Sequence, residues 1–418
     1  MRCMMEVSSV KLKSAHYTCF KMARPIYHHS SNLSYHSTRE ECLHDVNRRL
    51  SLSTSSAYHL GRRREKLNTM TETGAVSTGE EVNLTADTIT ELRNNTFAIV
   101  DNFLSLDLAN RLLSEAESLN SNGKFKQHYF QFGASALAKP AVYELDLSAP
   151  DDAMNKDIIN NLGSSSSSSW RDIIDQVGPA FVKTVDEFDK QFDASNSSSS
   201  CAPALSLDTT TRPAIKIQIN TGGGSFPWHY DNPGPPNQRA LTCVVYLNPR
   251  WKHGDGGEIV LWPFLSKPTT ISPLHCRAVL FYSDRVLHRV LPSKVRRVCF
   301  TIWSVSNDVN SKKDVALSKD VLQFRSYDEA ATFFANSPLQ RVISRAVYSE
   351  EYLESLLECI EGSSREKEGA VISESIISAV DKEKVIKQHN ASVQSIVSKL
   401  RPLIEEFRRR KECIANQD

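Results

Sequence analysis

The amino-acid sequence predicts a mostly β fold with supporting helices, of the sandwich, jelly-roll or barrel kind. Between residues 214 and 305, apolar residues recur at every second position in seven short segments, a spacing typical of strands with one buried face. Turns rich in glycine, proline and asparagine separate these segments. On either side of this region the apolar spacing is that of helices. Many short strands at close intervals favour a closed or two-sheet β architecture.

Each element ahead of this region has its own local signal. Residues 97–100 form a short apolar strand candidate, and Ser105 is a suitable N-cap for a helix that Gly123 ends. A second helix is predicted between two serine-rich loops, because apolar residues there repeat at helical spacing. Its apolar stripe consists of Trp170, Ile173, Ile174, Val177, Phe181, Val185 and Phe188.

The strand candidates of the central region follow in order, divided by turns at residues 222–224, 232–236 and 254–257. They lie at residues 214–220, 226–231, 240–247, 258–262, 278–282, 286–291 and 297–305.

After Asn307 the pattern becomes helical again, and residues 308–418 are predicted to form a helical C-terminal region. Pro402 interrupts one long apolar stripe there, so we expect a kinked or restarted helix. The stripe contains Val393, Ile396, Val397, Leu400, Leu403, Ile404 and Phe407. Amphipathic spacing alone does not separate core packing from dimerisation or partner docking.

Length, charge and cysteine content exclude several classes of protein. A chain of 418 residues is longer than one ordinary domain and predicts two or three regions. A formal net charge of +1 argues against coating nucleic acid or an anionic membrane as the main task. No apolar run reaches the roughly 18 residues that a membrane span needs. Nine scattered cysteines without a CxxC pair indicate reduced thiols, as in the cytoplasm or nucleus.

Residues 1–83 differ in composition from the rest. Through Lys66 they contain twelve Lys and Arg against five Asp and Glu, and half of the twelve histidines lie there. Three interpretations stay open: an organellar transit peptide for a mitochondrion or plastid, a disordered tail, or an extension ahead of a translation start at Met70. We expect a catalytic unit at residues 84–307, with its β core at 212–306.

Three residues in the β region have the chemistry of metal ligands. His229 and Asp231 are two positions apart in FPWHYDNPG, so on one strand their side chains point to the same face. His288 lies on a later strand candidate. Two imidazoles and one carboxylate form the facial triad of non-haem Fe(II) oxygenases. The His-x-Asp pair alone is weak evidence, since it occurs by chance in many chains.

Arg297 strengthens the case because of its place on the last strand. Alternate residues there divide into an apolar face of Val298, Phe300 and Ile302 and a second face of Arg297, Cys299, Thr301 and Trp303. A buried arginine beside a metal requires an anion, and a guanidinium pairs with a carboxylate through two hydrogen bonds. The alternative is an ion pair with a protein acid such as Asp284.

At this point the sequence resembles the 2-oxoglutarate- and Fe(II)-dependent prolyl 4-hydroxylase superfamily, most of all the oxygen-sensing (hypoxia-factor) prolyl hydroxylases. The matching motifs fall in the expected order, and an entry segment, DNFLSLDLANRLLSEAESL, extends the likeness to residues 84–307. The motifs are HYDNP, RALTCVVYLNPRW, GDGGEIVLWP, LFYSDRVLH and RRVCFTIW. The resemblance implies a double-stranded β-helix (jelly-roll) core.

The resemblance also implies roles for individual residues. His229, Asp231 and His288 would bind Fe(II), and Arg297 would hold the distal carboxylate of 2-oxoglutarate with the help of Tyr246. The same pocket would be lined by Thr242 and Thr301 and walled by Trp303. O₂ would be the second cosubstrate, and L-ascorbate would keep the iron reduced.

One departure from the family pattern concerns the strand ahead of the ligands. Family members often have tyrosines where this chain has Ile219 and Phe226, and Gln218 is the nearest polar candidate. This departure affects the details of the cosubstrate contacts and the substrate, and it leaves the metal triad intact.

The implied activity is hydroxylation of an unactivated C–H bond, on a prolyl or other residue of a protein or peptide, with release of succinate and CO₂. A small-molecule hydroxylase belongs to the same class. A zinc-dependent hydrolase with the same ligands would give Arg297 no role and lacks an obvious general base. A non-enzymatic binding module would not need a complete triad.

Overall fold

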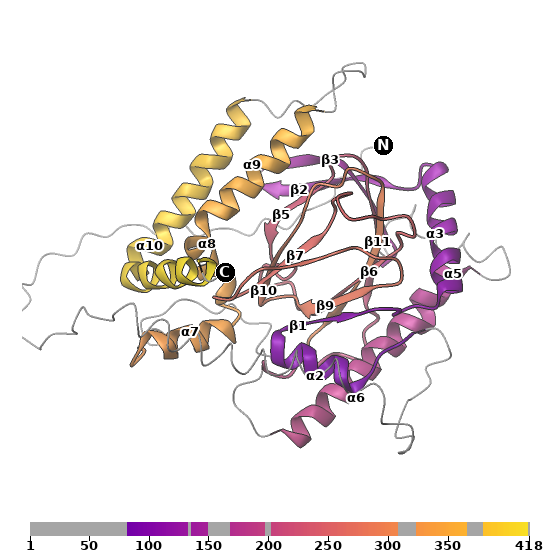
Figure 1. Ribbon diagram of the computed structural model, residues 1–418, viewed down its shortest axis with the longest axis horizontal. Coiled ribbons are helices and arrows are strands. Elements are labelled where there is room, and N and C mark those ends of the chain that lie inside the picture. The colour runs from indigo at the N-terminus through magenta and orange to yellow at the C-terminus, as the bar shows by residue number, and fades with distance from the viewer. Residues whose placement is uncertain are drawn as a thin grey trace, which may run out of the picture. The chain divides into compact units, whose positions relative to one another are not determined.

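The computed structural model describes residues 82–132, 135–148, 168–196, 202–307, 323–365 and 379–416 (Figure 1). All of them fall within one compact unit, Thr71–Asp418. The predicted leader at residues 1–83 lies almost wholly outside the described residues. No helix within the described ranges combines the length and apolar character that crossing a bilayer requires.

The larger of two sheets has seven strands, and neighbouring strands in it run antiparallel. Its spatial order is β1 (Phe97–Val100), β9 (Ala278–Tyr282), β6 (Arg239–Tyr246), β11 (Arg297–Val305), β4 (Ala214–Asn220), β3 (Ser135–Asp146) and β2 (Lys126–Phe132).

The smaller sheet has four strands, again antiparallel. Its order is β5 (Phe226–His229), β10 (Val286–Val290), β7 (Ile259–Pro263) and β8 (Thr269–Ile271). From β4 to β7, and again from β9 to β11, successive strands alternate between the two sheets. This arrangement confirms the predicted double-stranded β-helix with supporting helices.

Strand β11 shows why the sequence folds in this way. Its alternate residues Val298, Phe300 and Ile302 are almost fully buried and join the main apolar core. Phe300 meets the edge of Trp170 with ring centroids 5.2 Å apart, an arrangement that favours aromatic pairs. The Trp170 indole N–H donates to the Leu112 carbonyl at 3.2 Å. The two-residue period therefore seats this strand against the helices that precede the β region.

These helices cover one side of the β core (Figure 1). They are α2 (Ala86–Asn95), α3 (Leu106–Ser121), α5 (Ser169–Asp172), the π-helical turn η1 (Ile173–Val177) and α6 (Gly178–Ser195). As predicted, the Ser105 side chain caps α3 by accepting from the Leu108 N–H, and Gly123 follows in the left-handed region at φ +68°. The helix predicted from Trp170 contains the π turn, which the apolar spacing did not indicate.

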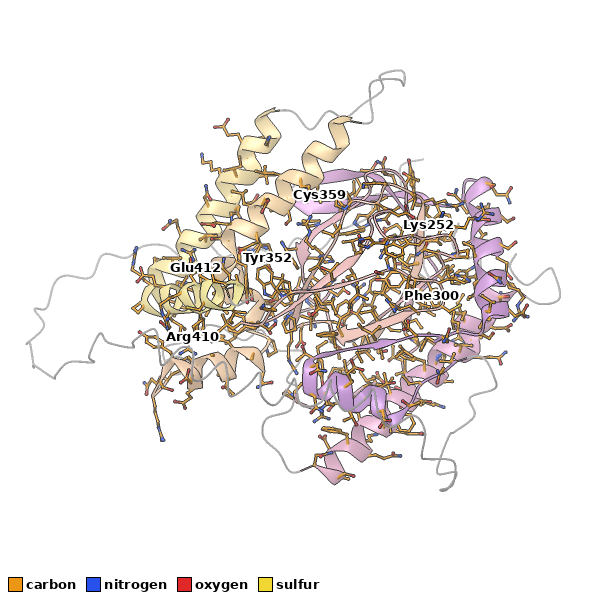
Figure 2. The ribbon with its side chains drawn as sticks, in the orientation of Figure 1. Lys252, Phe300, Tyr352, Cys359, Arg410 and Glu412 are labelled. Carbon is orange, nitrogen blue, oxygen red and sulfur yellow. The ribbon has the colours of Figure 1, made fainter. Side chains whose placement is uncertain are left out.

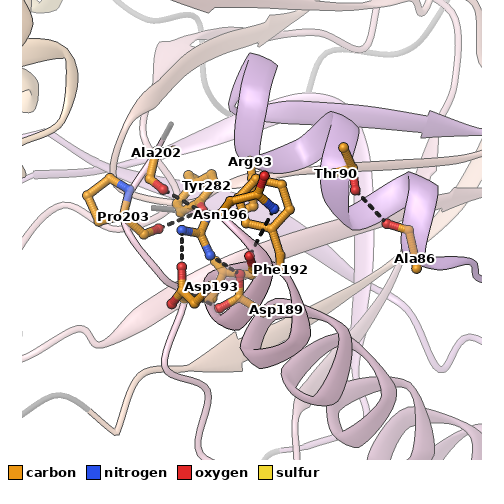
Figure 3. Close-up of polar contacts among 11 residues, drawn as sticks. Ala86, Thr90, Arg93, Asp189, Phe192, Asp193, Asn196, Ala202, Pro203 and Tyr282 are labelled. Carbon is orange, nitrogen blue, oxygen red and sulfur yellow. Dashed lines mark hydrogen bonds and ion pairs between the residues drawn. The ribbon is translucent and has the colours of Figure 1, made fainter. Parts of the chain in front are cut away.

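A buried arginine ties the helices to the loop that enters the β region (Figure 3). Arg93 on α2 pairs with Asp189 at 2.7 Å and with Asp193 at 2.6 Å, and its Nε donates to the Ala202 carbonyl at 2.8 Å. Asp189 also accepts from the Leu205 N–H. Each polar group thus has a partner, which a buried ion pair requires.

The C-terminal helices lie on the opposite side of the β core (Figure 1). They are α7 (Tyr327–Ala335), α8 (Gln340–Val347), α9 (Ser349–Arg365) and α10 (Ala379–Ala415). Their apolar faces form a second core with residues of the smaller sheet, including Trp228, Trp262 and Leu287. Helix α10 kinks at Leu400, whose φ is −131°, two residues before Pro402, as the sequence indicated. These faces are occupied by core packing.

Some elements differ from the sequence-based expectation. Strand β5 ends at His229, so Asp231 lies beyond the strand instead of on it. The reason is the turn that begins there, where the Asn232 side chain accepts from the Gly234 N–H and the Asn232 N–H reaches the Ser283 carbonyl. Helix α2 and the hairpin of β2 and β3 were not predicted.

Replacing Phe407 by alanine should lower the free energy of unfolding by about 3–5 kcal/mol, because it removes a large ring from a closed core. Phe407 is fully buried and meets the rings of Phe264 and Phe334, with centroid separations of 5.3 and 6.2 Å. Urea denaturation measures the change. Phe333→Ala is the matched control, since this neighbouring ring is 36% exposed. Equal losses in both variants would contradict the docking of α10 on the smaller sheet.

Candidate metal centre

The pairing of β5 with β10 brings the two histidines together. His229 lies directly opposite His288 in the antiparallel register, and their ring centroids are 4.2 Å apart. Asp231 follows two residues after β5, and one ligand atom from each of the three residues lies within 4.8 Å of the others. The three predicted ligands therefore converge on one point.

The orientation of both imidazoles suits metal binding. The Nδ1 of His229 lies 2.8 Å from the Pro227 carbonyl, and that of His288 lies 3.1 Å from the Val286 carbonyl. Each Nδ1 can carry the proton and donate it to the carbonyl, which leaves the Nε2 lone pair free. Both Nε2 atoms point toward Asp231 Oδ1, at 3.7 and 3.8 Å.

The Asp231 carboxylate is held by its other oxygen. Oδ2 accepts from the Thr242 hydroxyl at 2.8 Å and from the Trp303 indole N–H at 3.0 Å. Burial by itself raises the pKa of this carboxyl. The two imidazoles and these two hydrogen bonds outweigh it, so the net pKa lies below the usual value. The carboxylate is thus kept ionised, with Oδ1 directed at the histidines.

The triad opens into a cavity of about 580 Å³. Arg297, Cys299, Thr301 and Trp303, the predicted second face of β11, all line it, together with Gln218. Thr242 and Tyr246 are fully buried and stand outside the lining residues.

Arg297 is 1% exposed. Its Nε donates to the Gly257 carbonyl at 2.8 Å, and its Nη1 lies 3.2 Å from Cys299 Sγ. No acid in the described part of the chain pairs with it, and Asp284 instead contacts Arg285 at 3.5 Å. A buried guanidinium without a counter-ion is costly, so an anion from outside the protein fits here.

Two neighbours shape the surroundings of Arg297. Gly257 has a φ of +79°, and a Cβ there would lie 2.8 Å from Arg297 Cδ, so only glycine fits. The Tyr246 ring centroid is 5.0 Å from the guanidinium carbon. Its buried hydroxyl meets no partner with hydrogen-bond geometry among the described residues, and burial raises its pKa to about 12 despite the nearby Arg297 charge. The hydroxyl is available as a donor.

Sequence reasoning missed a charged group at the cavity, contributed by the unpredicted hairpin. His128 and Lys216 both contact Glu144, at 2.6 and 3.1 Å. Lys139 stands 3.3 Å above the centre of the Phe226 ring, and burial lowers its pKa to about 7. The alternating signal of β2 and β3 is weak in the sequence, so only the tertiary structure reveals these side chains.

The C-terminal helices line another part of the cavity, which the sequence did not predict. Arg345 on α8 and Tyr352 and Leu356 on α9 line the cavity, and Figure 2 shows Tyr352 on the side of α9 that faces the sheets. These helices also support the ligand strand. The Trp228 N–H donates to the Ser355 hydroxyl at 3.2 Å, and the hydroxyls of Tyr230 and Ser344 lie 2.8 Å apart.

The donor set fits a divalent transition metal. Two imidazoles and one carboxylate on one side of a metal leave positions open for other ligands, which is the arrangement of non-haem Fe(II) oxygenases. The hydrogen bonds to each Nδ1 and to Asp231 Oδ2 supply the outer partners that such ligands need. Arg297 and the Tyr246 hydroxyl fit a carboxylate bound beside the metal.

Parts of this chain are similar to known proteins. A family model described as the 2OG-Fe(II) oxygenase superfamily matches residues 215–305. The hypoxia-inducible factor prolyl hydroxylase of Caenorhabditis elegans is 28% identical over 237 residues, which cover 53% of this chain and 28% of that protein. Human prolyl hydroxylase EGLN3 is 34% identical over 84 residues, or 19% of this chain and 35% of that protein. The chain thus spans about a third of these curated relatives.

A solved structure extends the likeness to the whole fold. A crystal structure reported for prolyl 4-hydroxylases from Phytophthora capsici superposes with a TM-score of 0.55 and 28% identity. The match covers 84% of this chain and 99% of the other, so it reaches well beyond the segment of the family model. Residues 215–305 thus match the 2OG-Fe(II) oxygenase superfamily, and the fold of this chain is similar to that of a prolyl 4-hydroxylase.

Proposed function

We propose that the chain is an Fe(II)- and 2-oxoglutarate-dependent dioxygenase that hydroxylates a prolyl residue in a protein or peptide. One observation carries the proposal: the three ligand residues line the same cavity as a buried arginine that has no counter-ion among the described residues. A metal and a dicarboxylate are the two groups that would complete these residues.

The three ligand residues would hold Fe(II) through the Nε2 atoms of the two histidines and the Asp231 carboxylate. A backbone carbonyl lies beside each Nδ1, so each Nε2 can serve as the ligand atom. The two imidazoles, Trp303 and Thr242 hold the pKa of Asp231 below its usual value despite its burial. Iron bound there would catalyse the oxidation of 2-oxoglutarate by O₂ to succinate and CO₂, coupled to hydroxylation of an unactivated C–H bond. L-ascorbate is the reductant we expect to keep the metal ferrous.

The second face of β11 would position 2-oxoglutarate. Arg297 would pair with its distal carboxylate, and the Tyr246 hydroxyl would donate to the same group. Thr301 and Gln218 line the cavity and offer further polar contacts. The apolar packing around these side chains excludes water from the reacting groups.

The substrate class follows from the likeness to relatives. The protein from C. elegans is named a hypoxia-inducible factor prolyl hydroxylase, and the Phytophthora structure is described as a prolyl 4-hydroxylase. The cavity of about 580 Å³ has room for a side chain beside the cosubstrate. A zinc hydrolase with the same ligands would leave Arg297 without an anion, which disfavours it.

Purified protein with Fe(II), 2-oxoglutarate and O₂ should form succinate, and His288→Ala should abolish it. The same variant should weaken Mn(II) binding by more than the roughly 10–100-fold that loss of an outer-shell partner costs. Titration followed by electron paramagnetic resonance measures this binding. His275→Ala is the control, because the His275 ring contacts Asn110 at 3.2 Å and does not line the cavity of the triad. Undiminished Mn(II) affinity in His288→Ala would sink the ligand assignment.

Arg297→Gln should reduce the affinity for 2-oxoglutarate roughly 10–100-fold, because a charged hydrogen bond contributes about 1.5–3 kcal/mol. Calorimetry on the Mn(II)-loaded protein measures it. Arg296→Gln is the matched control, since this adjacent side chain is 37% exposed and pairs with Glu117 at 3.1 Å. If both variants bind 2-oxoglutarate equally well, Arg297 does not hold the cosubstrate.

Tyr246→Phe separates cosubstrate binding from stability. The lost hydroxyl has no hydrogen-bond partner among the described residues, so the thermal midpoint of the free protein should not fall. Affinity for 2-oxoglutarate should drop about fivefold, as expected for one hydrogen bond of about 1 kcal/mol. The opposite pattern, with lower stability and unchanged affinity, would show that the hydroxyl serves the protein fold alone.

A further inference from the structure

Two arginines that the catalytic site does not use face its cavity. Arg239 begins β6, and Arg345 lies on α8, more than a hundred residues later in the chain. Both line the cavity that contains the triad. Within the described ranges, neither forms an ion pair with a carboxylate.

Aromatic rings fix the guanidinium groups of both residues. The Arg239 guanidinium carbon is 4.0 Å from the centre of the Trp303 ring, and that of Arg345 is 5.2 Å from the centre of the Tyr352 ring. Arg239 Nη1 also makes a long contact of 3.4 Å with the Asp231 carbonyl. Stacking occupies the face of a guanidinium and leaves its N–H edge available to a planar anion.

Three other cations in this part of the structure have acidic partners. Lys216 pairs with Glu144 at 3.1 Å, Arg285 contacts Asp284 at 3.5 Å, and Arg289 pairs with Glu358. The whole chain is close to neutral, with a formal charge of +1. The two arginines without a carboxylate partner are therefore a local feature, which a generally basic composition does not explain.

The metal and the cosubstrate do not account for these two charges. A divalent cation, the Asp231 carboxylate, the Arg297 guanidinium and doubly charged 2-oxoglutarate sum to zero. Arg239 and Arg345 remain as an excess of positive charge in a partly enclosed space, where charge attracts an oppositely charged ligand strongly.

The chain segments that present these arginines border the same opening. The loop at residues 232–239 approaches α8 closely, because a Cβ on Gly234 would lie 2.5 Å from the Arg341 guanidinium. Pro233 and Asn237 of this loop line the cavity, as do Tyr352 and Leu356 of α9. A lining that combines Pro233, Tyr352 and Leu356 with two arginines suits a peptide that carries a carboxylate near its reacting residue.

We propose that Arg239 and Arg345 select a peptide substrate with an Asp or Glu side chain close to the residue that is hydroxylated. The inference rests on the proposed function and adds the chemical class of the substrate. Arg345 carries the test, because Arg239 also contacts a metal ligand and its loss would disturb two functions at once.

The first experiment uses the full chain loaded with Mn(II) and 2-oxoglutarate. A peptide library with a central proline and random neighbours is passed over the immobilised protein, and bound sequences are read by mass spectrometry. We expect enrichment of Asp and Glu within a few positions of the proline. Retention of no peptide, or of peptides without acidic enrichment, would overturn the proposal.

The second experiment compares the best acidic peptide with versions that carry Asn or Gln, or Lys, at the same place. The amide version should bind wild-type protein about tenfold more weakly. Arg345→Gln should remove this difference, and Arg345→Glu should prefer the Lys version. Arg401→Glu is the control, since this exposed residue of α10 should keep the wild-type preference. An unchanged preference for the acidic peptide in Arg345→Gln would contradict the assignment.

The two hypotheses can fail separately. The acidic peptides are also incubated with Fe(II)-loaded protein, 2-oxoglutarate and O₂. Selective binding without succinate formation or hydroxylation would support the role of the two arginines and contradict the oxygenase function. Succinate formation at equal efficiency with peptides of every charge would support the oxygenase function and contradict the role of the arginines.

Discussion

The site depends on one carboxylate that connects the two sheets. Asp231 Oδ2 accepts hydrogen bonds from Thr242 on β6 and Trp303 on β11, both in the larger sheet, while Oδ1 faces histidines of the smaller sheet. The metal site therefore exists only when both sheets are packed at their native separation. Because β5 ends before Asp231, the geometry of this residue comes from these two donors and from the turn after it, more than from strand alternation. Loss of either donor would free the carboxylate to rotate.

Arg297 imposes the second constraint, which is electrostatic. The protein buries a permanent cation and supplies a carbonyl and a thiol, while no acid in the described part of the chain pairs with it. A residue in such a place is unfavourable until an anion binds, so the folded chain is prepared for a dicarboxylate at some cost to its own stability. Gly257 makes the arrangement possible by allowing the guanidinium stem to pass where a side chain would collide. Binding energy and folding energy are thus linked at one residue.

Much of the site is readable in the sequence, and the rest is not, for physical reasons. The triad and Arg297 follow from local spacing and from motifs that fall in order. The apolar and cavity faces of β11 likewise follow from a two-residue period. The hairpin of β2 and β3 was not predicted because its charged residues, Lys139 and Glu144 among them, interrupt the alternation of apolar and polar residues that indicates strands. The part of the cavity lined by Arg345 and Tyr352 was not predicted because amphipathic spacing indicates which face of a helix is buried but not which partner covers it.

The position of strand β5 at the edge of its sheet determines how long an expressed fragment has to be. Among the described strands, β5 pairs with β10 alone. On its other side the Ser355 hydroxyl of α9 accepts a hydrogen bond from the Trp228 N–H, which a neighbouring strand would otherwise accept. A chain cut after Asn307 would keep every residue of the matched segment, yet it would leave an exposed sheet edge beside the first ligand. Unpaired edges invite association with other chains. The smallest fragment suited to expression and crystallisation therefore extends through the C-terminal helices.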